Sequence, residues 1–227
     1  ARLENRIADV TAHRAETIRI AAYASIAMHW MPEILYRFRR VCPDTDVDLR
    51  MVDHAIEPFE LLESGRTDVI FAARQNRITC DWTPLGRDLM YAILPEDYPV
   101  RGRESFPVEE FEGKEFLMPY GKFDIDVNAV LNANRVRPNI RPCYVDDETV
   151  IRMVSKGLGV TMMTEIMIRG RTHGVQALPV SPQAGRELGM GMLLRRNTPQ
   201  ELLRLRDCVL DFLRELPQEP AHIAART

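Results

Sequence analysis

The sequence lacks the cysteine and histidine spacings that build metal or redox sites. Its four cysteines, at positions 42, 80, 143 and 208, are far apart, and no CxxC pair occurs. Zinc sites need ligands at close, regular spacing, so no metal site is expected. We interpret the cysteines as reduced, partly buried thiols of a cytoplasmic protein.

Common catalytic motifs are also missing: there is no GxSxG, HExxH, Walker A or GxGxxG. Ser25 has His29 four residues further on, which could suggest a nucleophile and its base. No acidic residue is placed by spacing to orient that histidine, and a helical i, i+4 pair is weak evidence for catalysis. The sequence therefore predicts a protein that is not an enzyme and that carries no cofactor.

Long apolar runs and an excess of positive charge are absent as well. No apolar run approaches the ~18 residues that suggest a membrane-spanning helix, and residues 1–16 have no signal-peptide core. The formal net charge is −3, whereas a self-sufficient DNA-binding domain usually has a basic face. With 227 residues and 45% hydrophobic content, the chain can form one large domain or two small lobes.

The stretch at 17–49 carries the clearest structural pattern. It predicts a strand at 18–22, a loop at 23–25, a helix, a turn at 42–44 and a second strand at 47–52. The helix is predicted from apolar residues at helical spacing: Met31, Ile34, Leu35, Phe38 and Val41. A strand–helix–strand unit favours a parallel sheet, in which ligands bind beyond the carboxyl ends of the strands.

Predicted strands and helices continue to alternate along the rest of the chain, which indicates a second α/β lobe. Asp124 or Asp126, and Asp146 or Asp147, can cap two further helices. Thr198 opens a predicted capping box with Pro199 as the first helical residue. Two lobes crossed twice by the chain imply a ligand cleft between them. Predicted strands lie at 69–73, 89–94, 116–118, 143–145, 160–163 and 186–192.

Three parts of the sequence form a recognisable set: the segments VIRMVSKGLGVTMMTE (150–165) and GRTDVIFAAR (65–74), and a group of residues near the start, namely Ser25, Met31, Pro32, Phe38, Pro43 and Val47. Together they resemble the effector-binding domain of LysR-type transcriptional regulators. The resemblance covers roughly 18–216 in the expected order. The implied fold has two Rossmann-like lobes joined by two crossover strands, similar to type-2 periplasmic binding proteins.

The resemblance also implies a division of the chain. Lobe I comprises 17–91 and returns at 188–217, whereas lobe II comprises 92–187. Residues 1–16 would be the end of a linker helix that follows a winged helix-turn-helix absent from this chain, and 218–227 would be a tail.

The same resemblance implies which residues line an effector cleft. The residues it implies are Ala24, Ser25, Arg74, Tyr120, Gly121, Phe123, Thr161 and Thr164. Asp53 and His54 are predicted as further site residues from their position after the second strand. Arg74 could pair with a carboxylate or could be an exposed or interface arginine, and His54 could be a solvated loop residue. His29 and Trp30 are bulky and could fill or cap the cleft. The polar lining suggests a small, acidic effector.

The first interpretation is thus a ligand-sensing module of a transcription regulator. Its expected partners are a small-molecule effector and a second copy of the chain, in a homodimer or a larger tetramer. DNA would be contacted only through the absent N-terminal domain, and no membrane is involved. An alternative with the same fold is the solute-binding protein of a transport system.

Overall fold

The computed structural model describes residues 17–52, 56–119, 121, 124–194 and 198–216. The described residues form two compact units: unit 1 takes residues from 17–85 and 189–216, and unit 2 takes residues from 86–188. The chain thus passes from unit 1 to unit 2 after residue 85 and returns after residue 188. These two crossings were predicted after residues 91 and 187. The predicted linker helix and tail lie outside the described residues.

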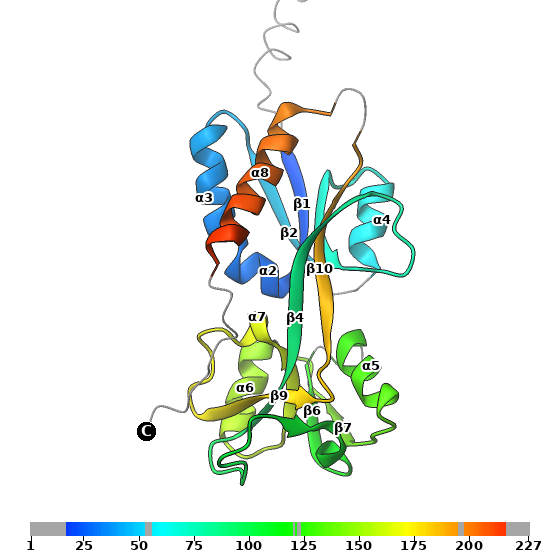
Figure 1. Cartoon of the computed structure of the whole chain (residues 1–227), viewed down its shortest axis with the longest axis vertical. Coiled ribbons are helices and arrows are strands. Elements are labelled where there is room, and N and C mark those ends of the chain that lie inside the picture. Colours follow the sequence, from blue (N-terminus) through cyan, green and yellow to red (C-terminus); the bar gives the residue numbers. More distant parts are fainter. Residues whose placement is uncertain (1–16, 53–55, 120, 122–123, 195–197, 217–227) are drawn as a thin grey trace, which may run out of the picture. The chain divides into compact units, whose positions relative to one another are not determined.

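Unit 1 is built around strand β1, which lies between β2 and β3 and runs parallel to both. The predicted strand–helix–strand opening is confirmed, because β1 and β2 flank two helices in the chain. Helices α3 and α8 lie side by side on one side of the sheet (Figure 1). The elements are β1 (Ile18–Tyr23), α2 (Ala24–His29), α3 (Met31–Val41), β2 (Val47–Val52), α4 (Glu57–Glu63), β3 (Val69–Ala73) and α8 (Gln200–Glu215).

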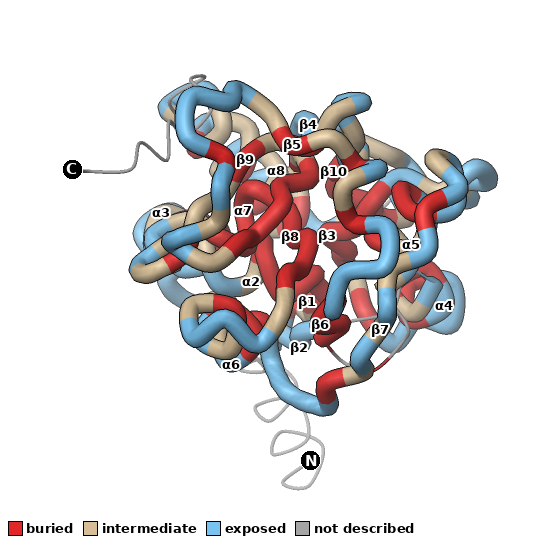
Figure 2. Tube along the Cα trace, turned by 90° about the horizontal axis from the view of Figure 1, so that it is seen from below, coloured by how far each residue is buried: buried red, intermediate tan, exposed pale blue. Residues whose placement is uncertain are grey.

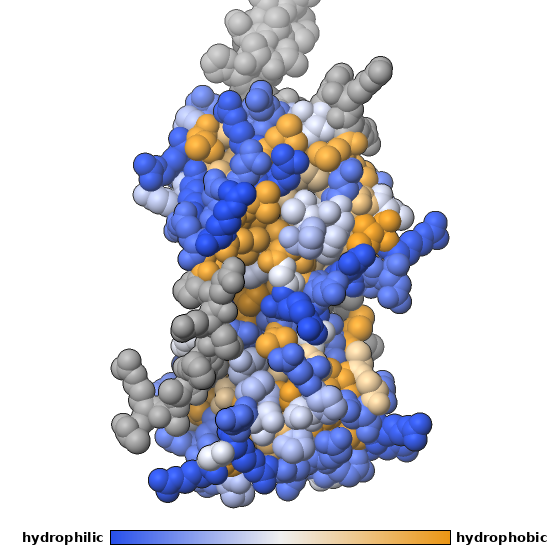
Figure 3. Space-filling model, viewed as in Figure 1, coloured by the Kyte–Doolittle hydropathy of each residue, from blue (hydrophilic) through white to orange (hydrophobic). Residues whose placement is uncertain are grey.

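The core of unit 1 forms where the apolar stripes of α3 and α8 meet the sheet. Met31, Ile34 and Phe38 are buried as predicted, but Val41 is half exposed, so that part of the prediction was wrong. The buried stripe continues from Phe38 to Cys42, four residues on, which is the helical neighbour on the same face. Figure 3 shows hydrophilic side chains over the outer faces of α3 and α8.

The loop predicted at 23–25 was also wrong, because α2 begins at Ala24 directly after β1. Ser25 and Ile26 are buried in this short helix. Six residues give too little periodicity for a sequence pattern to reveal a helix.

Strands β4 (Asp81–Pro95) and β10 (Gly185–Met192) each continue from one unit into the other. β4 was predicted only at 89–94, since its first half is polar and contains both Pro84 and Gly86. Such residues usually interrupt strands, so this half carries no strand signal.

Unit 2 has a separate hydrophobic core, with Phe106, Phe111 and Phe116 fully buried near its centre. β4 pairs antiparallel with both β8 and β9, and β6 runs parallel to β7. Figure 2 shows the buried strand segments in red and exposed turns on α5 and α6. The elements are β5 (Phe106–Pro107), a 3-10 turn (Val108–Phe111), β6 (Glu115–Met118), α5 (Ile125–Ala133), β7 (Asn139–Pro142), α6 (Asp147–Ser155), β8 (Thr161–Thr164), α7 (Glu165–Ile168) and β9 (Val175–Ser181).

Two local predictions were wrong. The strand expected at 143–145 lies at Asn139–Pro142, where polar residues on its exposed side mask the pattern, while Tyr144 is 85% exposed. Helix α8 begins at Gln200, one residue later than predicted, with Pro199 at the N-cap and no side-chain cap bond. None of the helices described here is long and apolar enough to cross a membrane.

Candidate functional site

In unit 1, Ala24 and Ser25 form the first turn of α2, immediately after the carboxyl end of β1. Ser25 is 1% exposed, and Ala24 is buried beside it. The first turn of α2 contains no acidic residue and no side-chain cap bond. The backbone N–H groups at this helix start therefore point to the edge where α/β sheets usually bind ligands.

Arg74 directly follows β3, whose five residues are all buried. The Arg74 side chain is exposed. Because β1 and β3 are parallel neighbours, their carboxyl ends lie at the same edge of the sheet, with Ser25 shortly after β1 and Arg74 directly after β3. Asp53 and His54 were predicted for this edge but lie outside the described residues. Whether these residues bind an effector stays a prediction.

In unit 2, Gly121 lies in the connection between β6 and α5 and has a positive φ of 84°. Its N–H donates to the Cys143 carbonyl oxygen at 3.0 Å. A Cβ atom at Gly121 would lie 3.2 Å from the ring of Tyr144, so the missing side chain leaves room for this exposed aromatic ring. Tyr144 was not predicted as a site residue. Tyr120 and Phe123 lie outside the described residues.

The two predicted threonines of β8 differ sharply in their surroundings. Thr161 is fully buried, and its hydroxyl donates to the Leu117 carbonyl oxygen at 2.6 Å. Thr164 ends the strand and is the N-cap of α7. Its hydroxyl oxygen accepts a hydrogen bond from Arg186 at 3.3 Å. The geometry favours Thr164 for contact with a ligand.

Arg186 is the centre of an ionic cluster that the sequence did not reveal. Its Nε and Nη2 atoms donate to Asp88 Oδ2 at 3.1 and 2.9 Å, and its Nη1 donates to Asp126 Oδ2 at 2.9 Å. Asp88 also accepts the Ile166 N–H at 3.0 Å through its other oxygen. One arginine thus joins β10, β4, the start of α5 and the start of α7.

The start of α5 adds a second acidic group to this cluster. Asp124 caps the helix by accepting the Val127 N–H at 2.9 Å. Burial raises the pKa of the Asp124 carboxyl, the Val127 hydrogen bond opposes this, and the charge of Asp126 raises it further. Arg186 acts in the opposite direction. The cluster therefore combines one guanidinium with three carboxyl groups of unequal burial.

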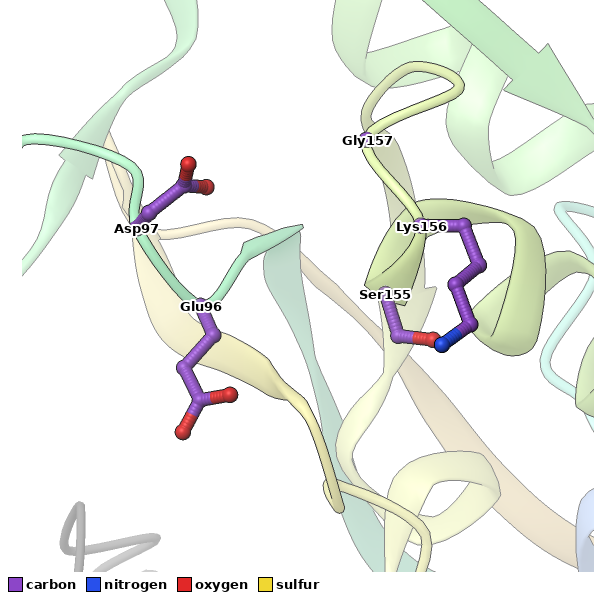
Figure 4. A pocket seen from close by; sticks show the side chains of 5 residues that line it. All are labelled: Glu96, Asp97, Ser155, Lys156 and Gly157. Carbon is purple, nitrogen blue, oxygen red and sulfur yellow. The ribbon is translucent and has the colours of Figure 1, made fainter.

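A hollow of about 590 Å³ lies elsewhere on unit 2, at the carboxyl end of α6 (Figure 4). Glu96 and Asp97 come from the turn after β4, and the Lys156 side chain folds back towards Ser155. Ligands in α/β folds bind beyond the carboxyl ends of parallel strands, which is the end where α6 begins rather than ends. We therefore place the candidate site at Thr164 and Arg186 rather than in this hollow.

Metal binding finds no support in the described part of the chain, where no group of three or more His, Cys, Asp or Glu residues could hold an ion. The acidic residues around Arg186 are engaged with its guanidinium or with helix N–H groups.

A family model described as "LysR substrate binding domain" matches residues 11–216 of this chain. Among curated proteins, the chain is 23% identical over 179 residues to the HTH-type transcriptional regulator TtuA of Agrobacterium vitis, covering 76% of this chain and 58% of that protein. It is 21% identical over 169 residues to the uncharacterized HTH-type transcriptional regulator YybE of Bacillus subtilis, covering 73% and 58%. The chain thus spans less than two thirds of these relatives.

Solved structures show the same fold at low identity. The regulatory domain of CcmR from Synechocystis PCC6803, in complex with 2-PG, aligns with a TM-score of 0.77 and 15% identity, covering 89% of this chain and 99% of that one. The BenM effector binding domain with its effector benzoate aligns with a TM-score of 0.75 and 16% identity, covering 93% of this chain and 99% of that one. The effector binding domain of QuiR in complex with shikimate aligns with a TM-score of 0.70 and 14% identity, covering 88% of this chain and 98% of that one.

Proposed function

Because this chain belongs to the LysR substrate-binding domain family, we propose that it is the ligand-sensing part of a bacterial transcription regulator. The observation that carries this proposal is the family match over 11–216, which spans both units and their two connecting strands. Its role would be to bind a small effector and to control transcription from the cytoplasm. Such a role needs different affinities for two conformational states, and it does not need catalysis.

The effector we propose is a small organic acid. The structural relatives include proteins solved with benzoate and with shikimate, both of which are carboxylic acids. In this chain, the exposed Arg74 after β3 can form paired hydrogen bonds to a carboxylate. Ser25 at the start of α2 offers a hydroxyl group in the same unit as Arg74. Thr164 at the end of β8 offers a hydroxyl group in unit 2.

The remaining predicted contacts belong to the same proposal. Asp53, His54, Tyr120 and Phe123 would add polar and aromatic groups, and Gly121 would permit close backbone approach. The other partners of the regulator are proposals as well: a second copy of the chain in a dimer, and DNA through a helix-turn-helix like those named for the curated relatives.

A thermal-shift screen tests the sensing role directly. The chain is titrated with benzoate, shikimate and other small carboxylates, each beside its neutral amide. Binding to the folded state raises Tm in a dose-dependent way. The free energy of unfolding increases by about 2.7 kcal/mol when the ligand concentration is about a hundred times Kd. We expect a rise with at least one acid and none with its amide. A Tm that stays constant across the whole panel would count against the proposal.

The Arg74→Ala variant locates the response. Removing one end of a charge-assisted hydrogen bond should weaken binding of the identified acid roughly tenfold by calorimetry. Arg77→Ala is the matched control, since it removes an equal charge from an exposed residue three positions away. Equal affinities for both variants would remove Arg74 from the site.

A further inference from the structure

Arg186 holds two carboxylates that differ in how firmly they are fixed. Its side chain is 14% exposed, Asp88 is 0% exposed and Asp126 is 31% exposed. The two ion pairs have the same length, 2.9 Å, so distance alone does not distinguish them. The two carboxylates differ instead in their burial and in the other hydrogen bonds that they accept.

Asp88 is a structural partner that cannot leave. One of its oxygens accepts two N–H groups of Arg186, and the other accepts the Ile166 N–H at the start of α7. Displacing it would leave a buried charge and a buried backbone donor without partners, which is strongly unfavourable. Asp88 therefore holds the guanidinium through its Nε and Nη2 atoms, while Nη1 donates to Asp126.

Asp126, the partner of Nη1, is far easier to replace. It lies in the first turn of α5, where its side chain is partly solvated, and it meets Arg186 through a single oxygen. A carboxylate that leaves Arg186 here remains near the N-terminus of α5. The helix dipole and the surrounding water stabilise the negative charge at that position. Release of Asp126 therefore leaves no uncompensated buried charge.

We propose that Arg186 is a further residue that binds a carboxylate group of an acidic effector, in addition to Arg74, and that Asp126 is an internal substitute for that carboxylate in the ligand-free chain. This inference rests on the proposed function, because it assumes that the chain senses such an acid. The exchange replaces one carboxylate on Nη1 by another, so the number of carboxylates that Arg186 holds does not change. Thr164, whose hydroxyl oxygen already accepts from Arg186, lies beside the exchanged group and can donate to it.

The exchange also gives a physical link between binding and conformation. When Asp126 leaves Arg186, the start of α5 loses its ionic tie to β10 and β4. The ligand thus favours a state in which α5 is released, and the ligand-free chain favours the tied state. A ligand shifts a two-state equilibrium only through such a difference in contacts.

Acetate tests the site without knowledge of the effector. Asp126→Ala removes the carboxylate to which Nη1 of Arg186 donates, and acetate is a carboxylate small enough to take the place of that group. We expect acetate to raise the Tm of Asp126→Ala in a saturable way, at constant ionic strength, with no effect of acetamide. Asp97→Ala, which removes an exposed aspartate at the other end of unit 2, should respond as the unaltered chain does. Equal acetate responses in all three proteins would overturn the proposal.

A second variant keeps this test separate from the test of function. Asp126→Asn removes the competing charge but keeps the size of the side chain. It should lower the Kd of any acid identified in the screen by roughly threefold to tenfold. An unchanged Kd would overturn the role of Arg186 while leaving the sensing function intact. A third outcome is that acetate raises the Tm of Asp126→Ala while no acid in the thermal-shift screen raises the Tm of the unaltered chain. That outcome would support the carboxylate site and count against the proposed function.

Discussion

An arginine–aspartate fork is present among the described residues of each unit, and these two forks differ mainly in burial. In unit 1, Asp68 accepts the Nε, Nη2 and backbone N–H groups of Arg19 at 2.7 to 3.0 Å. In unit 2, Asp88 accepts two N–H groups of Arg186 and one backbone N–H of Ile166. The side chains are 42% and 29% exposed in the first fork, but 14% and 0% in the second.

Burial decides what each fork does for its unit. A solvated ion pair loses little when it is broken, because water takes over both charges. A buried pair gains little net energy from forming, yet removing one partner is costly because the other charge stays desolvated. Breaking the Arg19–Asp68 fork should therefore cost about 1 kcal/mol or less. Breaking the Arg186–Asp88 fork should cost several times as much.

The largest predicted effect follows from breaking the buried fork. Asp88→Ala leaves Arg186 without its main partner and the Ile166 N–H without its acceptor. We expect a loss of about 3–5 kcal/mol in the free energy of unfolding, measured by urea denaturation. Asp97→Ala, at an exposed position of the same unit, should change it by less than about 0.5 kcal/mol. Similar values for both variants would contradict the assignment of Asp88 as a buried structural partner.

Much of the fold follows from local sequence patterns. Val47–Val52 and Val69–Ala73 are predicted with their observed bounds, since short apolar or alternating runs between turn residues indicate strands. Helix caps such as Asp124 and Asp146 are equally local, because the side chain bonds an N–H three residues away. Elements whose exposed residues hide the pattern, such as Asn139–Pro142, are not predictable in this way.

The ionic cluster could not be predicted for a different reason. Asp88 and Arg186 are 98 residues apart in the chain and meet only because β4 and β10 belong to the same sheet. Each belongs to a charged pair before a largely apolar run, Asp88 after Arg87 and Arg186 before Glu187, so the sequence carries little signal for the cluster. A polar residue adjoining a buried strand needs a partner, but the sequence does not say which partner it has. Thr164 was predicted for a local reason, as the end of a strand.

The exposed fork should produce a smaller effect, and one that depends on pH. Asp68→Asn should lower the free energy of unfolding by about 1 kcal/mol at pH 7. Burial acts to raise the pKa of Asp68, but the hydrogen bonds and charge of Arg19 outweigh it, so the pKa falls below its ordinary value of 3.8. The contribution is thus fully present above about pH 4 and is lost as the pH falls through the folded-state pKa. Urea denaturation of both proteins between pH 7 and pH 3 should show the difference shrinking. A constant difference would contradict an ionic fork.

The smallest predicted effect compares two helix caps within unit 2. Asp124 and Asp146 accept the N–H three residues on at 2.9 and 2.8 Å, so their cap bonds are equivalent. Their surroundings differ: burial raises the pKa of Asp124, whereas hydrogen bonds from Thr149 lower the pKa of exposed Asp146. Asparagine caps nearly as well as aspartate but carries no charge.

Asp146→Asn should therefore destabilise the chain by a few tenths of a kcal/mol at pH 7, roughly 0.3. Asp124→Asn should leave stability unchanged or raise it slightly, since ionised Asp124 is disfavoured in the folded state. This advantage should shrink as the pH falls through the raised pKa of Asp124, because the original carboxyl then becomes neutral too. Tm measurements at pH 7 and at acidic pH distinguish the two caps. A larger loss for Asp124→Asn than for Asp146→Asn would show that Arg186, the cation facing Asp124, outweighs burial at the start of α5.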